Sequence, residues 1–143
     1  MNTIVVGIDG SDASKAALEW ALAEADLRGD SVRAVHAWAM PYVAYGYPGW
    51  TVDPEDFHNA AQATLDQTVA AAVGEENGDV EVESKLVEGL TAETLLAEAA
   101  DADLLVVGSR GHGGFAGLLL GSVSHQCAQH AGCPVVIIRA PGS

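Results

Sequence analysis

A glycine-rich segment contains the residues best suited to bind an anion, reading GSRGHGGFAGLLLGS from Gly108 to Ser122. It follows the apolar residues 104–107, which predict a buried strand, and it precedes residues 123–131, which predict a helix. Glycine lets the backbone approach an anion closely, and the first turn of a helix offers N–H groups without intrahelical partners. The order of strand, glycine-rich loop and helix therefore indicates a phosphate-binding site.

Two better-known phosphate-binding loops do not fit this segment. A Walker A loop needs Gly-Lys followed by Ser or Thr, which the segment lacks. Residues 111–116 match the dinucleotide pattern G-x-G-x-x-A, but they come after the fourth expected strand. In addition, no acidic residue lies about 20 residues further on to hold a ribose. A Rossmann-type dehydrogenase is excluded, and a surface connection without a ligand remains the alternative to a phosphate site.

This part of the chain also contains cationic residues and residues of metal-ligating type. Arg110 lies between motif glycines in a chain with only 6 Lys and Arg residues, so we expect it to bind phosphate. His112 could face either phosphate or solvent. His125 and Cys127 would point to different faces of a helix, and no further ligands complete a zinc site. We therefore expect Cys127 and Cys133 to be buried or half-buried thiols.

Strand and helix signals alternate along the whole chain and predict one α/β domain over residues 1–143. Ser11 or Asp12 can begin the first helix, with Gly29 as its stop, and Asp53 followed by Pro54 predicts the start of the second. Repeated β-α units predict a parallel sheet with helices on both faces. The expected strands are residues 4–8, 32–38, 80–87, 104–107 and 134–138, and the expected helices are residues 12–28, 54–76, 91–100 and 123–131.

Composition narrows the possible partners. The chain has 143 residues, of which 49% are hydrophobic and 18% charged, and 20 Asp and Glu against 6 Lys and Arg give a net charge of −14. So acidic a protein repels nucleic acid and anionic membranes, so neither is an expected partner. No apolar stretch approaches the ~20 residues of a membrane span, no signal peptide is expected, and two cysteines make no secreted disulfide framework. We expect a cytoplasmic protein.

Two further segments bear on assembly. Val135 to Ile138 is apolar throughout, so if it forms the last strand of the sheet a partner must cover it, which predicts a homodimer through this strand. Five aromatic residues fall in the connection that begins at the carboxyl end of the second expected strand, on the ligand side of the sheet. These residues are Trp38, Tyr42, Tyr45, Tyr47 and Trp50. That connection is either a lid, a dimer contact or, by default, a packed loop.

The spacing of the motif glycines resembles that of a known family. Gly108, Gly111, Gly121 and Ser122 fit G-x2-G-x9-G-[S/T], the nucleotide-binding signature of the ATP-binding universal stress proteins. The resemblance covers the whole chain, including the first strand with its terminal Asp9, residues 34–37, residues 87–89 and the closing residues 134–138. It implies a five-stranded sheet in the order 3-2-1-4-5, a dimer, and ATP bound where the first and fourth strands part.

The resemblance also implies roles for individual residues. Asp9 would contact the ribose or help hold Mg²⁺, and Ala37 would meet the adenine through its backbone. The ribose and phosphates would be bound by Val107, Gly108, Gly111, Gly121, Ser122 and Val123. From the residues alone, Asp9 is equally explained as a turn residue, and Ser122 has the place of a helix N-cap.

The function expected is therefore that of a dimeric ATP-binding sensor or regulator of the stress response. No nucleophile–base pair stands out, so a catalytic role would rest on Asp9, Ser122 and bound Mg²⁺ alone. Two alternatives remain open: a slow ATPase or nucleotidyl-transfer enzyme, and a protein that binds AMP or cyclic AMP.

Overall fold

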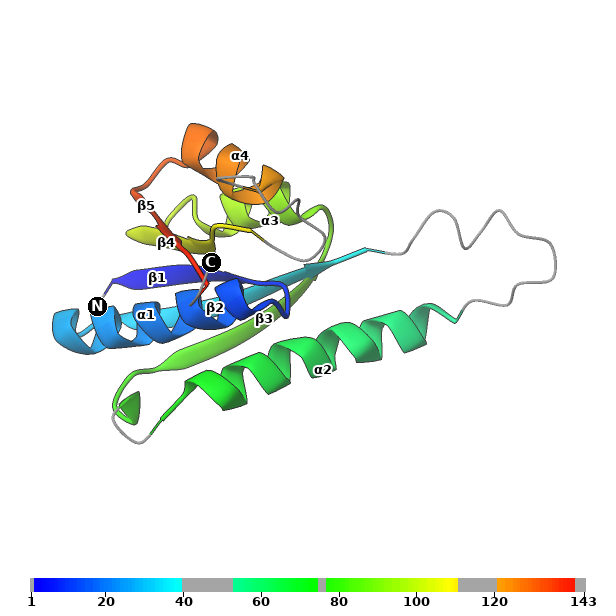
Figure 1. Ribbon diagram of the computed structural model, residues 1–143, viewed down its shortest axis with the longest axis horizontal. Helices are drawn as coiled ribbons and strands as arrows, with labels where there is room; N and C mark the ends of the chain where they lie inside the picture. Colours follow the sequence, from blue (N-terminus) through cyan, green and yellow to red (C-terminus); the bar gives the residue numbers. More distant parts are fainter. Residues whose placement is uncertain (1, 40–52, 75–76, 111–120, 141–143) are drawn as a thin grey trace.

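The computed structural model describes residues 2–39, 53–74, 77–110 and 121–140. Five parallel strands form one sheet in the order β3-β2-β1-β4-β5, as the sequence predicted. Helices alternate with the strands along the chain (Figure 1). The elements are β1 (Thr3–Ile8), α1 (Asp12–Arg28), β2 (Ser31–Trp38), α2 (Pro54–Ala72), β3 (Val82–Glu88), α3 (Thr91–Glu98), β4 (Leu104–Gly108), α4 (Ser122–His130) and β5 (Val135–Ile138).

The sheet separates two apolar layers. α1 and α2 cover one face, where Leu18, Leu22 and Leu65 are fully buried against side chains of β1, β2 and β4. α3 and α4 cover the other face, where Leu95 and Cys127 pack on the alternate residues of the same strands (Figure 1). Because side chains alternate along a strand, β1 and β4 must be apolar on both faces, which explains the hydrophobic runs at residues 4–6 and 104–107.

Capping residues fix where the first two helices begin and end. Ser11 is the N-cap of α1, and its hydroxyl accepts a hydrogen bond from the Ser14 N–H at 3.1 Å. Gly29 ends α1 in the left-handed conformation, with φ of 73°. Asp53 caps α2 by accepting from the Glu55 N–H at 3.0 Å. These predictions from the sequence are confirmed, with Ser11 rather than Asp12 as the cap.

Several predicted boundaries were wrong by two to four residues. α2 ends at Ala72 rather than near residue 76, because Val73 has an extended backbone. The Asn77 N–H bonds the Gly74 carbonyl at 3.1 Å, the Val80 N–H bonds the Asn77 carbonyl, and β3 begins only at Val82. α3 ends at Glu98 rather than residue 100.

Candidate functional site

The ends of β1 and β4 form the point at which the chain reverses its direction across the sheet. β1 lies between β2 and β4, so the connection after β1 leads to one side of the sheet and the connection after β4 to the other. Open α/β sheets bind ligands in the crevice at such a switch point, beyond the carboxyl ends of the strands. Asp9 follows β1 and Ser109 follows β4, so the two halves of the expected site are neighbours.

Asp9 is held in a tight turn between β1 and α1. Its Oδ1 accepts hydrogen bonds from the Ser11 N–H at 2.9 Å and from the Ser11 hydroxyl. Its own N–H donates to the Ser14 hydroxyl at 3.3 Å, and Gly10 supplies the positive φ of 83° that the turn requires. The turn role considered for Asp9 is therefore present, and the same bonds fix the carboxylate at the switch point.

Gly108, the first motif glycine, lies against the start of α1. A Cβ atom built on Gly108 would lie 2.7 Å from the Ala13 Cβ and 2.9 Å from the Ala13 carbonyl carbon. No real side chain has such contacts with backbone, so only glycine permits α1 to approach β4 this closely. Packing thus gives a reason for glycine at this position that is independent of any ligand.

Gly121, the third motif glycine, is hydrogen-bonded to Ser109, which directly follows β4. Its N–H donates to the Ser109 carbonyl at 2.6 Å, and the buried Ser124 hydroxyl donates to the same carbonyl at 2.8 Å. The Ser109 N–H in turn donates to the Ile138 carbonyl of β5 at 2.7 Å. The start of α4 is therefore fixed beside the carboxyl ends of β4 and β5.

The sequence suggested Ser122 as the N-cap of α4, but the N-cap is Gly121. Gly121 has an extended backbone, with φ −76° and ψ 170°, and its carbonyl accepts the first helical bond, from the His125 N–H at 3.0 Å. Ser122 is the first helical residue and is exposed. α4 therefore has no side-chain capping bond at Gly121, and the Ser124 hydroxyl donates to carbonyl oxygens rather than accepting from an N–H.

The other expected site residues differ in how deeply they are buried. Ala37 and Val107 are buried, at 8% and 3% exposure. The alanine side chain has no polar atom, so Ala37 can offer a ligand hydrogen bonds only from its backbone. Val123 is half-buried and packs against the cluster on the α3 and α4 face, and Arg110 is half-buried just past β4. Gly111 and His112 lie outside the described residues, as do four of the five aromatic residues. The fifth, Trp38, makes an edge contact with His58, with ring centroids 5.4 Å apart.

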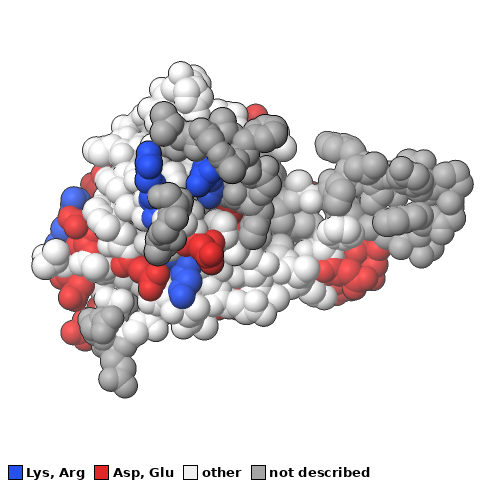
Figure 2. All heavy atoms as spheres, viewed as in Figure 1, with Lys and Arg blue, Asp and Glu red and all other residues white. Residues whose placement is uncertain are grey.

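The positive charges are unevenly distributed over this acidic chain. Arg28, Arg33 and Lys85 form ion pairs of 2.8–3.1 Å with Glu24, Glu83 and Glu98, respectively. Of the other three cations, Arg110 comes directly after β4 and Arg139 directly after β5, whereas Lys15 is exposed on α1. Figure 2 shows basic side chains in the middle of the visible face, and a separate acidic patch at the start of α2. Two of the six cationic residues of the chain thus lie just past the carboxyl ends of β4 and β5.

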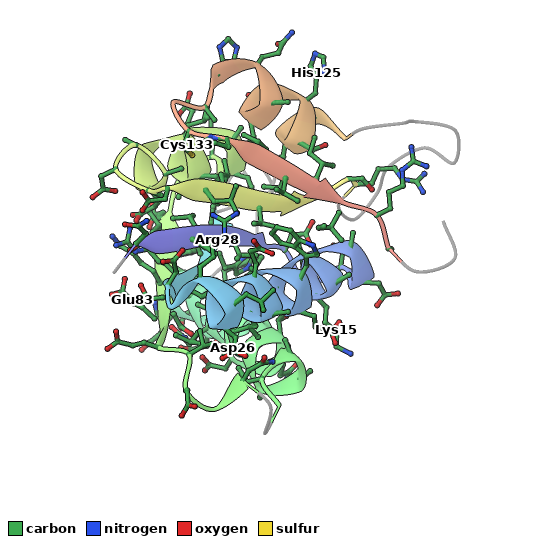
Figure 3. All side chains as sticks on the ribbon, turned by 90° about the vertical axis from the view of Figure 1, so that its left-hand side faces the viewer. Lys15, Asp26, Arg28, Glu83, His125 and Cys133 are labelled. Atoms are coloured by element: carbon green, nitrogen blue, oxygen red, sulfur yellow. The ribbon has the colours of Figure 1, made fainter. Side chains whose placement is uncertain are left out.

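A zinc site at α4 finds no support in the described part of the chain. His125 is exposed and projects away from the sheet, whereas Cys127 is fully buried and Cys133 lies just before β5 (Figure 3). Burial raises the pKa of the Cys127 thiol, and burial together with the nearby Asp103 charge raises the pKa of Cys133. No cluster of three metal-ligating side chains occurs among the described residues. Both cysteines are free thiols, as expected.

Three serines that organise the site were not identified from the sequence. Ser14, Ser109 and Ser124 bond the turn after β1, the end of β4 and the start of α4, as described above. A single serine in a helix or at a strand end has no spacing that distinguishes it. Only Ser14, three residues after the N-cap Ser11, had a positional signal.

The strand order β3-β2-β1-β4-β5 defines a doubly wound α/β protein, a class that binds ligands at the carboxyl edge of its sheet. A model of the universal stress protein family matches residues 1–139. A universal stress protein of Mycolicibacterium smegmatis is 39% identical over 140 residues, covering 95% of this chain and 45% of that protein. One from Mycobacterium tuberculosis is 37% identical over 136 residues, covering 95% and 44%. The chain belongs to the universal stress protein family, and it spans about half the length of these relatives.

Solved structures of the same family superimpose on the chain. A universal stress protein in complex with cAMP has a TM-score of 0.71 and 30% identity, and the match covers 97% of both chains. The universal stress protein of Archaeoglobus fulgidus in complex with dAMP has a TM-score of 0.70 and 27% identity, covering 96% of this chain and 98% of that one. An Arabidopsis thaliana family member with AMP bound has a TM-score of 0.66 and 25% identity, covering 99% and 93%. No helix among the described residues is long and apolar enough to span a membrane.

Proposed function

We propose that this protein binds ATP in the crevice between β1 and β4 and acts as a regulator of the stress response. The observation that carries the proposal is the attachment of Gly121 to the Ser109 carbonyl at 2.6 Å. This bond holds the N-terminus of α4 beside the end of β4, whose Gly108 lies against the start of α1, and the first N–H groups of a helix are suited to bind an anion. The complexes of relatives with cAMP, dAMP and AMP support an adenine nucleotide as the ligand.

In the proposed complex each part of the crevice binds one part of the nucleotide. The backbone of Ala37 meets the adenine, and Asp9 meets the ribose or the metal. The phosphates lie against the start of α4, within reach of Arg110. The residues that would bind the ribose and phosphates are Val107, Gly108, Gly111, Gly121, Ser122 and Val123.

The donor set suits Mg²⁺ carried by the nucleotide. Mg²⁺ prefers oxygen ligands and is usually held by one or two carboxylates together with substrate phosphates and water. Asp9 supplies such a carboxylate, already oriented by Ser11. The bound ion would neutralise phosphate charge that the acidic surface otherwise repels.

Gly121 offers a direct test of the phosphate site. Its extended backbone is one that any residue adopts, and Asp is a favourable N-cap, so Gly121→Asp should fold. The carboxylate would repel the phosphates, and we expect ATP binding to be lost in calorimetry. Gly121→Asn has the same size and capping ability without the charge, so it should lose much less affinity. Equal ATP affinity for a folded Gly121→Asp variant and the unaltered protein would contradict the proposal.

A second candidate function is favoured by the ligands of the neighbours, which are monophosphates. In this alternative the protein binds AMP or cAMP and makes no specific contacts with further phosphates. Denaturing the purified protein and identifying any released nucleotide separates the two. Titration with ATP, AMP and cAMP then ranks them, and cAMP binding far tighter than ATP would favour the alternative.

The proposal includes a homodimer formed through β5. This strand is at the edge of the sheet, and its four residues are only half-buried although all are apolar. Pairing with a second copy around a twofold axis would cover these side chains and satisfy the edge N–H and C=O groups. We expect Val136→Glu or Ile137→Glu to produce a monomer in light scattering, whereas Ser84→Glu on the opposite edge strand β3 should not. A dimer that survives both β5 changes would contradict this interface.

A cytoplasmic location is also proposed. The two cysteines are free, as is usual where glutathione and thioredoxin keep thiols reduced. Fractionation of cells expressing the tagged protein tests this location.

A further inference from the structure

The peptide unit between Ile8 and Asp9 is held from both sides by side chains. On one side, His36 Nδ1 lies 2.7 Å from the Ile8 carbonyl oxygen. A carbonyl oxygen only accepts hydrogen bonds, so Nδ1 carries the proton and donates. On the other side, the Asp9 N–H donates to the Ser14 hydroxyl at 3.3 Å. Contacts from β2 and α1 thus fix the plane of this peptide.

These side-chain contacts matter because β1 is no longer paired with β4 at Ile8. The ladder between β1 and β4 pairs Ile4 to Val6 with residues 104–106, whereas the ladder between β1 and β2 continues to Ile8 and His36. The last residues of β1 are therefore attached to the sheet from the β2 side. His36 provides the side-chain part of that attachment, beyond the point where the pairing of β1 with β4 ends.

His36 also differs in chemistry from its neighbours on the strand. Val32 and Ala34, which point to the same face of β2, are buried apolar residues of the core. His36 is half-buried at the end of this row, next to the switch point. An imidazole here supplies a donor that an apolar residue would not, and the acceptor is the residue directly before Asp9.

We propose that His36 is a positioning residue for the nucleotide site. By holding the Ile8 carbonyl it fixes the main chain that carries Asp9, while Ser11 fixes the carboxylate itself. Asp9 is then preorganised for the ribose or the metal, so no binding energy is spent on ordering it. The inference rests on the proposed function, because Asp9 is its link to the ligand.

The first experiment compares three variants by calorimetry with MgATP. His36→Leu removes the donor, and we expect about tenfold weaker binding, the upper range for one net hydrogen bond. His36→Asn places an amide N–H near the position of Nδ1 and should restore most of the affinity. His130→Leu is the matched control, because His130 is exposed at the end of α4, and its affinity should match that of the unaltered protein. If His36→Leu does not fold, His36→Gln replaces it, because its longer side chain does not present the amide at the Nδ1 position.

A double-mutant cycle separates positioning from general support of the fold. If His36 acts through Asp9, then His36→Leu should not weaken binding further in an Asp9→Ala background. Equal losses in both backgrounds, or full affinity in a folded His36→Leu variant, would overturn the inference while leaving the proposed nucleotide site intact. Failure of the unaltered protein to bind any adenine nucleotide would instead overturn the proposed function and, with it, this inference.

Discussion

The buried hydroxyl of Ser124 donates a hydrogen bond of 2.8 Å to the carbonyl of Ser109, fifteen residues earlier in the chain. The same hydroxyl lies 3.1 Å from the Gly121 carbonyl. One side chain of α4 thus connects the end of β4 with the residue that caps α4. It thus joins the two described ends of the glycine-rich motif, residues 108–110 and residues 121–122.

Replacing Ser124 should loosen this connection. Ser124→Ala removes the donor from a buried site, and we expect the free energy of unfolding to fall by about 1 kcal/mol in chemical denaturation. ATP affinity should fall as well, because Gly121 would be less firmly placed. Ser84→Ala, an exposed serine of β3, is the matched control and should change neither quantity. Unchanged stability and affinity in Ser124→Ala would show that the backbone bond from Gly121 to Ser109 suffices.

Gly108 should not tolerate even a methyl group. A Cβ at this position meets the backbone of Ala13 at 2.9 Å, so Gly108→Ala forces α1 away from β4. The expected cost is about 1–3 kcal/mol in the free energy of unfolding, as for other overpacked sites. Gly132→Ala, whose Cβ would have no atom within 4 Å, should be nearly neutral. Similar denaturation midpoints for the two variants would contradict the close approach of α1.

Arg110 should distinguish nucleotides by their phosphates. If its guanidinium binds the phosphate tail, Arg110→Ala should weaken ATP binding by about 1–3 kcal/mol and AMP binding by less. Lys15→Ala removes the same charge from the outer surface of α1 (Figure 3) and controls for the change in net charge. Equal losses for ATP and AMP would place the guanidinium away from the terminal phosphates, and an equal effect of Lys15→Ala would reduce its role to long-range electrostatics.

The two thiols should react slowly in the folded protein. Burial raises the pKa of both Cys127 and Cys133, so at neutral pH each has a smaller thiolate fraction than an ordinary cysteine. Alkylation by iodoacetamide should therefore keep accelerating as the pH rises above the ordinary thiol pKa of about 8.5. Half-buried Cys133 should react before Cys127, and in denaturant the two rates should become similar. Rapid labelling of Cys127 in the folded protein at pH 7 would contradict its burial.

Local signals in the sequence were enough to predict the architecture. Pro54 after Asp53 marks the start of α2, Gly29 marks the end of α1, and the apolar runs mark strands, because these effects act between residues close in the chain. Alternation of the elements then predicts a parallel sheet, and resemblance to a family gave the strand order that the structure confirms. Boundaries such as the end of α2 at Ala72 were missed because helix ends depend on where the core stops covering the helix.

The sequence by itself therefore determined the fold class and placed an anion-suited loop after the fourth strand. Tertiary structure alone decided why particular residues occupy the site: Gly108 faces Ala13, Ser124 reaches back to Ser109, and His36 holds the carbonyl before Asp9. The residues joined by each of these contacts lie 15 to 95 positions apart in the sequence. No local pattern encodes such pairs, because they arise only when the sheet brings its strands into register and the helices pack across them.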